Sequence, residues 1–210
     1  MKNRKYANKI GSSLIVMAIL AGVAYGWAHP QLKIGASNLN TVWIIALIAW
    51  TLIYILDLVI TKAICNLYSP VNKKWSRITA GLRLIYTMGL GIAIVQLFLA
   101  YSLYRNNTIT DEYFSYLQNF ETIWSISLIV FGLHLISWFV LMGEAKSWGK
   151  VWKYLLLIAG LGYVIVHSLH QSSIDKEVLK TIEGVLMLPM TLGELGTGIW
   201  LMIKFKRDVI

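Results

Sequence analysis

Residues 184–204 read GVLMLPMTLGELGTGIWLMIK, from Gly184 to Lys204. The run has about 20 residues of mostly apolar character, which is the length of helix that crosses the ~30 Å hydrocarbon core of a bilayer. A single carboxylate, Glu194, lies in the middle of it. A charge at the centre of a membrane helix costs ~2.5–3.5 kcal/mol on insertion scales, so we expect Glu194 to face other helices rather than lipid.

The composition extends this pattern to the whole chain, which is 57% hydrophobic with a mean hydropathy of +0.63. The apolar residues fall in long runs without the strict alternation of membrane β-strands. The spans are therefore helices, because lipid offers the backbone no hydrogen-bond partners. The net charge of +9 comes from basic residues beside the ends of the apolar runs, where topology explains them. We therefore exclude a nucleic-acid partner and expect the lipid bilayer as the partner.

Six apolar runs predict an all-α fold, a polytopic integral membrane protein formed by a six-transmembrane-helix bundle. The runs belong to a single membrane domain over residues 1–210, and the predicted spans are 10–28, 41–64, 78–104, 121–142, 152–170 and 181–205. Residues 110–120 are amphipathic and predict a short helix in the outer headgroup region, with a lid over a substrate opening as the alternative. In the first span, Ala18, Gly22 and Gly26 recur every four residues, which predicts a face for close helix packing.

The distribution of lysine and arginine predicts the orientation of the bundle. Counted along the chain, the segments between spans are alternately rich and poor in these residues. Fourteen of the nineteen fall on the side that holds both termini, four fall on the other side, and Arg83 lies inside a span. Basic residues accumulate on the cytoplasmic side of membrane proteins. We therefore predict that both termini are cytoplasmic.

Five spans each carry one polar or ionisable residue deep in an apolar run: Asp57, Arg83, His134, Tyr163 and Glu194. At ~1.5 Å per helical residue, all five lie ~8–14 Å from the inner ends of their spans. We predict that they meet in one buried ligand-binding site. We also expect Asp57 and Arg83 to form an ion pair, because either charge alone in lipid is prohibitive. The natural partner of Glu194 in this interpretation is His134.

The sequence identifies no cofactor and no metal site. His29, His167 and His170 lie at outer span ends, and with Glu183 or Asp175 they form the alternative of a metal site. Sequence spacing places only two of these histidines relative to each other, so we predict no metal. Glycine-rich segments at 89–91 and 193–198 lie within spans and follow no strand, so they do not predict a nucleotide-binding loop.

Several short motifs, in order from residue 70 to residue 201, resemble an uncharacterised prokaryotic membrane protein family, domain of unknown function 4386. The matching pieces are Pro70-Val-Asn-Lys73, Gly81-Leu-Arg-Leu-Ile85, Phe131-Gly-Leu-His-Leu135, Lys146-Ser147, Leu157-Ile-Ala-Gly-Leu-Gly-Tyr163, Pro189, Gly193-Glu-Leu195 and Trp200-Leu201. The resemblance implies a six-helix protein of the prokaryotic cytoplasmic (inner) membrane and places Arg83, His134, Tyr163 and Glu194 at motif positions. It implies no activity.

The sequence is compatible with three functions. The favoured hypothesis is a binding or transport module that holds a small ligand, a lipid or a proton at the buried polar site. The second is a structural subunit of an oligomer or a larger membrane complex, with the polar residues joining helices. The third is an intramembrane enzyme that uses His134 and Glu194 as acid and base.

Overall fold

The computed structural model describes residues 2–35, 39–143 and 148–204, and all of its regular elements are helices. They are α1 (Lys2–Ala21), the π-helix η1 (Gly22–Ala28), α2 (His29–Ile34), α3 (Asn40–Tyr68), α4 (Lys73–Arg105), α5 (Asp111–Leu141), α6 (Trp148–His170) and α7 (Lys176–Lys204). Six helical segments are long and apolar enough to cross a membrane. They include one continuous helical segment over Asn3–Ile34, which is longer than the predicted span 10–28 because the helix continues beyond the apolar run at both ends.

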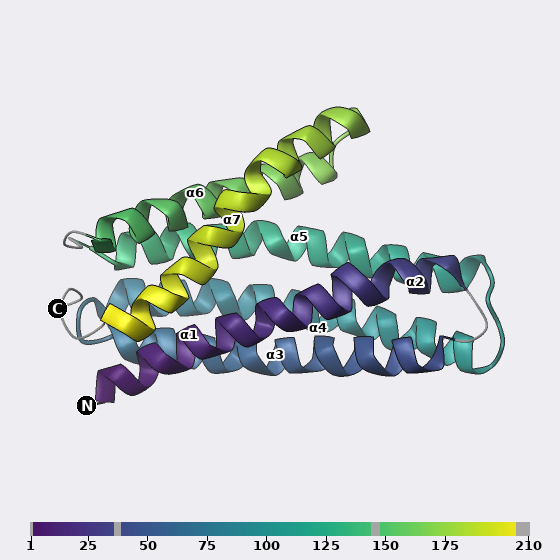
Figure 1. Ribbon diagram of the computed structural model, residues 1–210, viewed down its shortest axis with the longest axis horizontal. Helices are drawn as coiled ribbons and strands as arrows, with labels where there is room; N and C mark the ends of the chain where they lie inside the picture. The colour runs from purple at the N-terminus through teal and green to yellow at the C-terminus, as the bar shows by residue number, and fades with distance from the viewer. Residues whose placement is uncertain (1, 36–38, 144–147, 205–210) are drawn as a thin grey trace.

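The helices form a closed ring in chain order (Figure 1). The packed pairs are α1 with α3, α3 with α4, α4 with α5, α5 with α6, α6 with α7, and finally α7 with α1. Both described ends of the chain lie at one end of the bundle, which we call the terminal end, and the opposite end is called the distal end. Ring closure by α7 encloses an interior that six helices share.

Helix α7 crosses the bundle obliquely (Figure 1). It meets α1 near the terminal end, where a Cβ on Gly198 would lie only 3.4 Å from the Cα of Gly11. Toward the distal end the α6–α7 hairpin diverges from α1 and α2. The interior is therefore closed by direct backbone contact at the terminal end and wider at the distal end.

The predicted packing face on the first span is wrong at two of its three positions. A Cβ on Gly22 or Gly26 would meet nothing within 4 Å, so neither glycine lies against another helix. Both belong to η1, where the wider π-turn interrupts the α-helical geometry. The close contact with α7 is instead made at Gly11, about two turns before Ala18.

The predicted short headgroup helix at residues 110–120 is also wrong, because these residues are the first turns of α5. Part of their aromatic face is covered by protein: Tyr113 is fully buried, and its hydroxyl donates to the carbonyl of Leu32 at 2.8 Å. The Tyr113 ring also packs on Trp43 of α3. No proline or glycine occurs between Asp111 and Phe131, so nothing interrupts the helix as it passes from the amphipathic segment into the span.

Candidate functional site

The predicted ion pair between Asp57 and Arg83 is confirmed. Nη2 of Arg83 on α4 lies 2.5 Å from Oδ1 of Asp57 on α3, and both side chains have no exposed surface. Because α3 and α4 are adjacent in the ring, the two opposite charges compensate each other without any contribution from the other helices.

His134 completes this group from α5. Its Nε2 lies 3.3 Å from Nη1 of Arg83, and its Nδ1 lies 2.8 Å from the backbone carbonyl oxygen of Thr79. A guanidinium can only donate and a carbonyl can only accept, so Nδ1 carries the proton and Nε2 accepts. Both ring nitrogens are used in a fully buried position, and the geometry selects the neutral Nδ1–H tautomer.

The expectation that His134 pairs with Glu194 is therefore wrong. His134 bonds to Arg83 and Thr79, which both lie on α4. The reason is the order of the ring: α5 packs between α4 and α6, whereas Glu194 lies on α7, one position further around.

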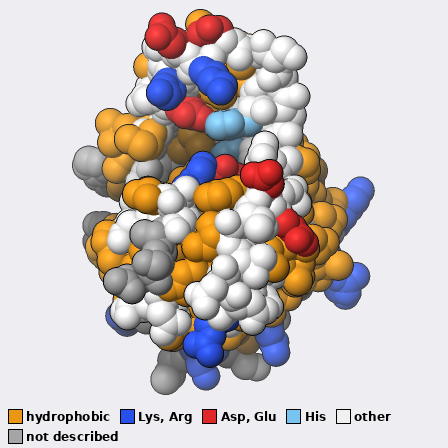
Figure 2. Space-filling view, turned by 90° about the vertical axis from the view of Figure 1, so that its right-hand side faces the viewer, with side chains coloured by type: hydrophobic (Ala, Val, Ile, Leu, Met, Phe, Trp, Pro, Cys, Tyr) orange, Lys and Arg blue, Asp and Glu red, His pale blue; other side chains and the backbone are white. Residues whose placement is uncertain are grey.

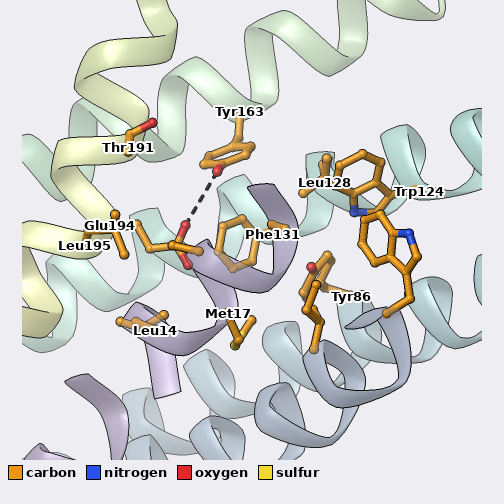
Figure 3. Close-up of a pocket in the computed structure, with 14 residues that line it drawn as sticks. Leu14, Met17, Tyr86, Trp124, Leu128, Phe131, Tyr163, Thr191, Glu194 and Leu195 are labelled. Carbon is orange, nitrogen blue, oxygen red and sulfur yellow. Dashed lines mark hydrogen bonds between the residues drawn. The ribbon is translucent and has the colours of Figure 1, made fainter. Parts of the chain in front are cut away.

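A cavity of about 260 Å³ lies inside the ring and receives side chains from α1 and from each of α3 to α7. Glu194 is the one carboxylate among the lining residues. The hydroxyl of Tyr163 on α6 points toward it and donates to Oε2 at 3.5 Å (Figure 3). Thr191, one turn before Glu194, and Tyr86 add two further hydroxyls to the wall. The cavity thus combines a carboxylate with three hydroxyl groups in an otherwise apolar wall.

Aromatic rings form much of the remaining wall (Figure 3). Trp50 and Trp124 meet edge to face with their centroids 5.0 Å apart. Phe131 meets Tyr163 at 5.0 Å with perpendicular planes, and it also packs on Tyr86 at 4.8 Å. Aromatic pairs at these separations hold each other in defined orientations, so this part of the wall has a fixed shape.

The structure divides the five predicted site residues into two adjacent groups. Tyr163 and Glu194 line the cavity, whereas Asp57, Arg83 and His134 form a separate buried cluster. Phe131 contacts both groups: its ring lies 5.3 Å from Cζ of Arg83, 5.7 Å from the imidazole of His134 and 5.0 Å from Tyr163. A ligand-binding role for any of these residues stays a prediction.

Three contributors to these groups are absent from the sequence-based prediction: Thr79, Tyr86 and Phe131. Tyr86 had a usable signal, because it lies one turn from Arg83 and so shares its helix face. The same signal was present for Phe131, which lies one turn before His134 and begins the family motif Phe131-Gly-Leu-His-Leu135. Thr79 contributes its backbone carbonyl to His134, and its hydroxyl shares a 2.7 Å hydrogen bond with Ser137.

The distal end carries the other histidines, around a hollow that Figure 2 shows between the α6–α7 hairpin and the rest of the bundle. Glu121 accepts from His29 at 2.9 Å and from Lys33 at 2.8 Å, and His170 pairs with Glu183. Within residues 2–35, 39–143 and 148–204, no group of three or more His, Cys, Asp or Glu residues could hold a metal ion. Glu121 and Glu183 each pair with basic side chains of the same end.

The distal end is connected to the cavity wall through aromatic contacts. Tyr25 on η1 meets Trp124 edge to face at 4.7 Å, and Trp124 lines the cavity. On the opposite side, the ring of His167 stacks on Tyr163 with centroids 5.9 Å apart. Nδ1 of the same histidine lies 3.0 Å from the hydroxyl of Ser125.

Six helices that are long and apolar enough to cross a membrane, closed into a ring around buried polar groups, are typical of the class of multi-pass membrane proteins. The chain belongs to the family described as Domain of unknown function (DUF4386), whose sequence model matches residues 10–204. The resemblance seen in the short motifs is thus confirmed over nearly the whole chain. Neither the curated proteins nor the solved structures include a match to the chain.

Proposed function

We propose that this protein is a membrane-embedded binding or transport module whose ligand occupies the cavity beside Glu194. The observation that carries the proposal is the contrast between the two polar groups. Asp57 and Arg83 are fully buried and paired at 2.5 Å, as expected of residues that join helices. Glu194 is only partly buried, accepts one long hydrogen bond of 3.5 Å, and faces an open volume. Intramembrane carboxylates in such a setting mark ligand or ion sites.

The shape of the interior supports access from the distal end. At the terminal end, α1 and α7 are in backbone contact at Gly11 and Gly198, and Trp152 of α6 fills the space beside Gly196. At the distal end the α6–α7 hairpin stands apart, and the surface is hollowed there (Figure 2). A ligand therefore reaches Glu194 from the distal side without moving the crossing of α1 and α7.

The alternative of an intramembrane enzyme has less support. Its acid–base pair requires His134 and Glu194 to act on one substrate. His134 has no exposed surface, and both of its nitrogens are engaged by Arg83 and Thr79. A general base must reach the proton that it abstracts, which this histidine does not.

The proposed setting is the cytoplasmic membrane of a prokaryote with the terminal end inside. The ring brings the lysine- and arginine-rich segments together at the terminal end, including Lys5, Lys9, Lys74 and Lys153. Three residues that also enter this charge count, Lys146, Lys206 and Arg207, lie outside the described residues, as does Ser147 of the family motif.

The orientation yields a topology prediction. Reporters fused to either terminus are expected to give a cytoplasmic signal, and a reporter inserted after Thr110 is expected to give an external one, because the basic segments are retained inside. Paired fluorescent and secreted-enzyme reporters measure this directly. A cytoplasmic signal after Thr110 would contradict the arrangement of six spans.

A cavity-filling substitution tests the function itself. Ala21 lines the cavity, so Ala21→Phe places a ring inside it, whereas Ile19→Phe adds a ring on the exposed side of the same helix. We expect Ala21→Phe to lower ligand occupancy roughly tenfold or more, since a filled pocket cannot hold a second group. Ile19→Phe is expected to leave occupancy unchanged.

Occupancy is measured by native mass spectrometry and by density in the cavity, after purification in discs of native lipid. A small molecule retained by the parent protein and by Ile19→Phe but lost from Ala21→Phe supports the proposal. A cavity with no such molecule, or one whose content is the same in all three proteins, would refute it and favour the structural-subunit hypothesis.

A further inference from the structure

We infer that the ligand of this cavity is a lipophilic organic cation, held by the Glu194 carboxylate and by the surrounding aromatic rings. The inference rests on the proposed function and specifies its ligand class. It follows from the charges that face the cavity, from the composition of its wall, and from the ligands that the same wall disfavours.

The charge balance around the cavity favours a cation. Among the lining residues, Glu194 on α7 is the one that can carry a full charge at neutral pH, and the other ionisable ones are the phenols Tyr86 on α4 and Tyr163 on α6. Arg83 and Asp57 lie within electrostatic range of Glu194, but their opposite charges compensate each other in the 2.5 Å pair. An ionised Glu194 therefore leaves one net negative charge at the cavity.

The aromatic side chains of the wall also favour a cation. Five of the fourteen lining residues are aromatic, and they come from four of the six helices: Trp50, Tyr86, Trp124, Phe131 and Tyr163. The face of an aromatic ring carries partial negative charge and attracts a cation, most strongly when both are removed from water. A carboxylate surrounded by several rings is the arrangement that recognises alkylammonium groups.

The same wall disfavours other classes of ligand. An anion would meet the Glu194 carboxylate and the negative ring faces together. A neutral acyl chain would gain nothing from a carboxylate that is costly to place in a membrane. An inorganic cation needs several oxygen ligands at short range, and the wall is mostly hydrocarbon, with Glu194, Thr191 and two phenols as its polar side chains. An organic cation satisfies both the charge and the apolar surface.

The test uses a pair of probes that differ only in charge. Benzyltrimethylammonium is the cation, and neopentylbenzene, in which carbon replaces the nitrogen, is its neutral analogue. Binding to the full-length protein is measured by titration calorimetry in detergent micelles, with empty micelles as the blank. We expect the cation to bind at least about tenfold more tightly than the neutral analogue, because the latter gains nothing from Glu194 or from cation–π contacts.

Three variants locate the interaction. Glu194→Gln keeps the shape of the side chain and removes its charge, and it is expected to lower the affinity for the cation by about tenfold or more. Glu183→Gln removes another carboxylate of α7, outside the cavity wall, and is expected to have no effect. Trp124→Leu keeps an apolar wall and removes one ring. It is therefore expected to lower the affinity for the cation and to change the affinity for the neutral analogue little.

The outcomes separate this inference from the proposed function. Equal affinity for the two probes overturns the cation assignment. The assignment is also overturned if neither Glu194→Gln nor Trp124→Leu lowers the affinity for the cation. If the neutral analogue binds the parent protein and Ala21→Phe abolishes that binding, the cavity remains a ligand site and the proposed function stands. Because Trp124→Leu leaves Glu194 in place, it also keeps the test decisive if Glu194→Gln does not fold. Failure of the cation to bind the parent protein overturns the inference outright.

Discussion

Asp57→Asn and Arg83→Gln are each expected to destabilise the protein by about 3–5 kcal/mol, because each leaves an uncompensated charge in a fully buried position. Loss of Arg83 also removes the donor to Nε2 of His134. The double variant Asp57→Asn/Arg83→Gln carries no such charge, so it is expected to recover a substantial part of the loss. The free energy of unfolding, measured by titration with a denaturing detergent, and the yield of monodisperse protein report the effect.

The control for this experiment is a second ion pair on the same molecule. Glu121 and Lys33 are paired at 2.8 Å, but the lysine side chain is 52% exposed and the glutamate 30%. Lys33→Gln is therefore expected to cost no more than about 1 kcal/mol, since water screens the exposed lysine and His29 still donates to Glu121. If the double variant at Asp57 and Arg83 is as unstable as the sum of the two single ones, the two residues are energetically independent and the pair does not join α3 to α4.

Gly132→Ala is expected to have the second largest effect, because it separates α5 from α6. A Cβ at Gly132 would lie 2.6 Å from the carbonyl oxygen of Gly160 and 2.9 Å from the backbone nitrogen of Val164. The obstructing atoms belong to the backbone, so no side-chain rotation relieves the overlap. Overpacking of this kind costs about 1–3 kcal/mol, and more where the two backbones must move apart. The attachment of the α6–α7 hairpin to α5 depends on this crossing.

The matched control is Gly81→Ala on α4, where an added Cβ would meet nothing within 4 Å. Its expected effect has the opposite sign, a gain of up to about 1 kcal/mol, because alanine favours the helix over glycine. Unfolding titrations of the two variants under identical conditions compare them directly. Equal stability of Gly132→Ala and the parent protein would show that α5 and α6 do not meet as closely as the structure has them.

The sequence alone was enough to predict the helical class, the six apolar spans and the ion pair of Asp57 with Arg83. These features depend on local quantities. The length and hydropathy of a run decide whether it can cross a bilayer, and a lone charge in such a run must find an opposite charge at a similar depth. Asp57 and Arg83 lie on consecutive spans at a similar depth, so the sequence left few alternatives for their pairing.

Only the tertiary structure decided the partner of His134, the position of the cavity and the continuity of α5 with its amphipathic start. His134 and Glu194 lie at comparable depths, yet the ring places α6 between their helices. The rotation of each helix and the closeness of each crossing depend on small residues such as Gly132, Gly160 and Gly198, whose partners lie far away in the sequence. Depth in a bilayer follows from the distance along one helix, whereas contact between helices depends on the packing of all of them together.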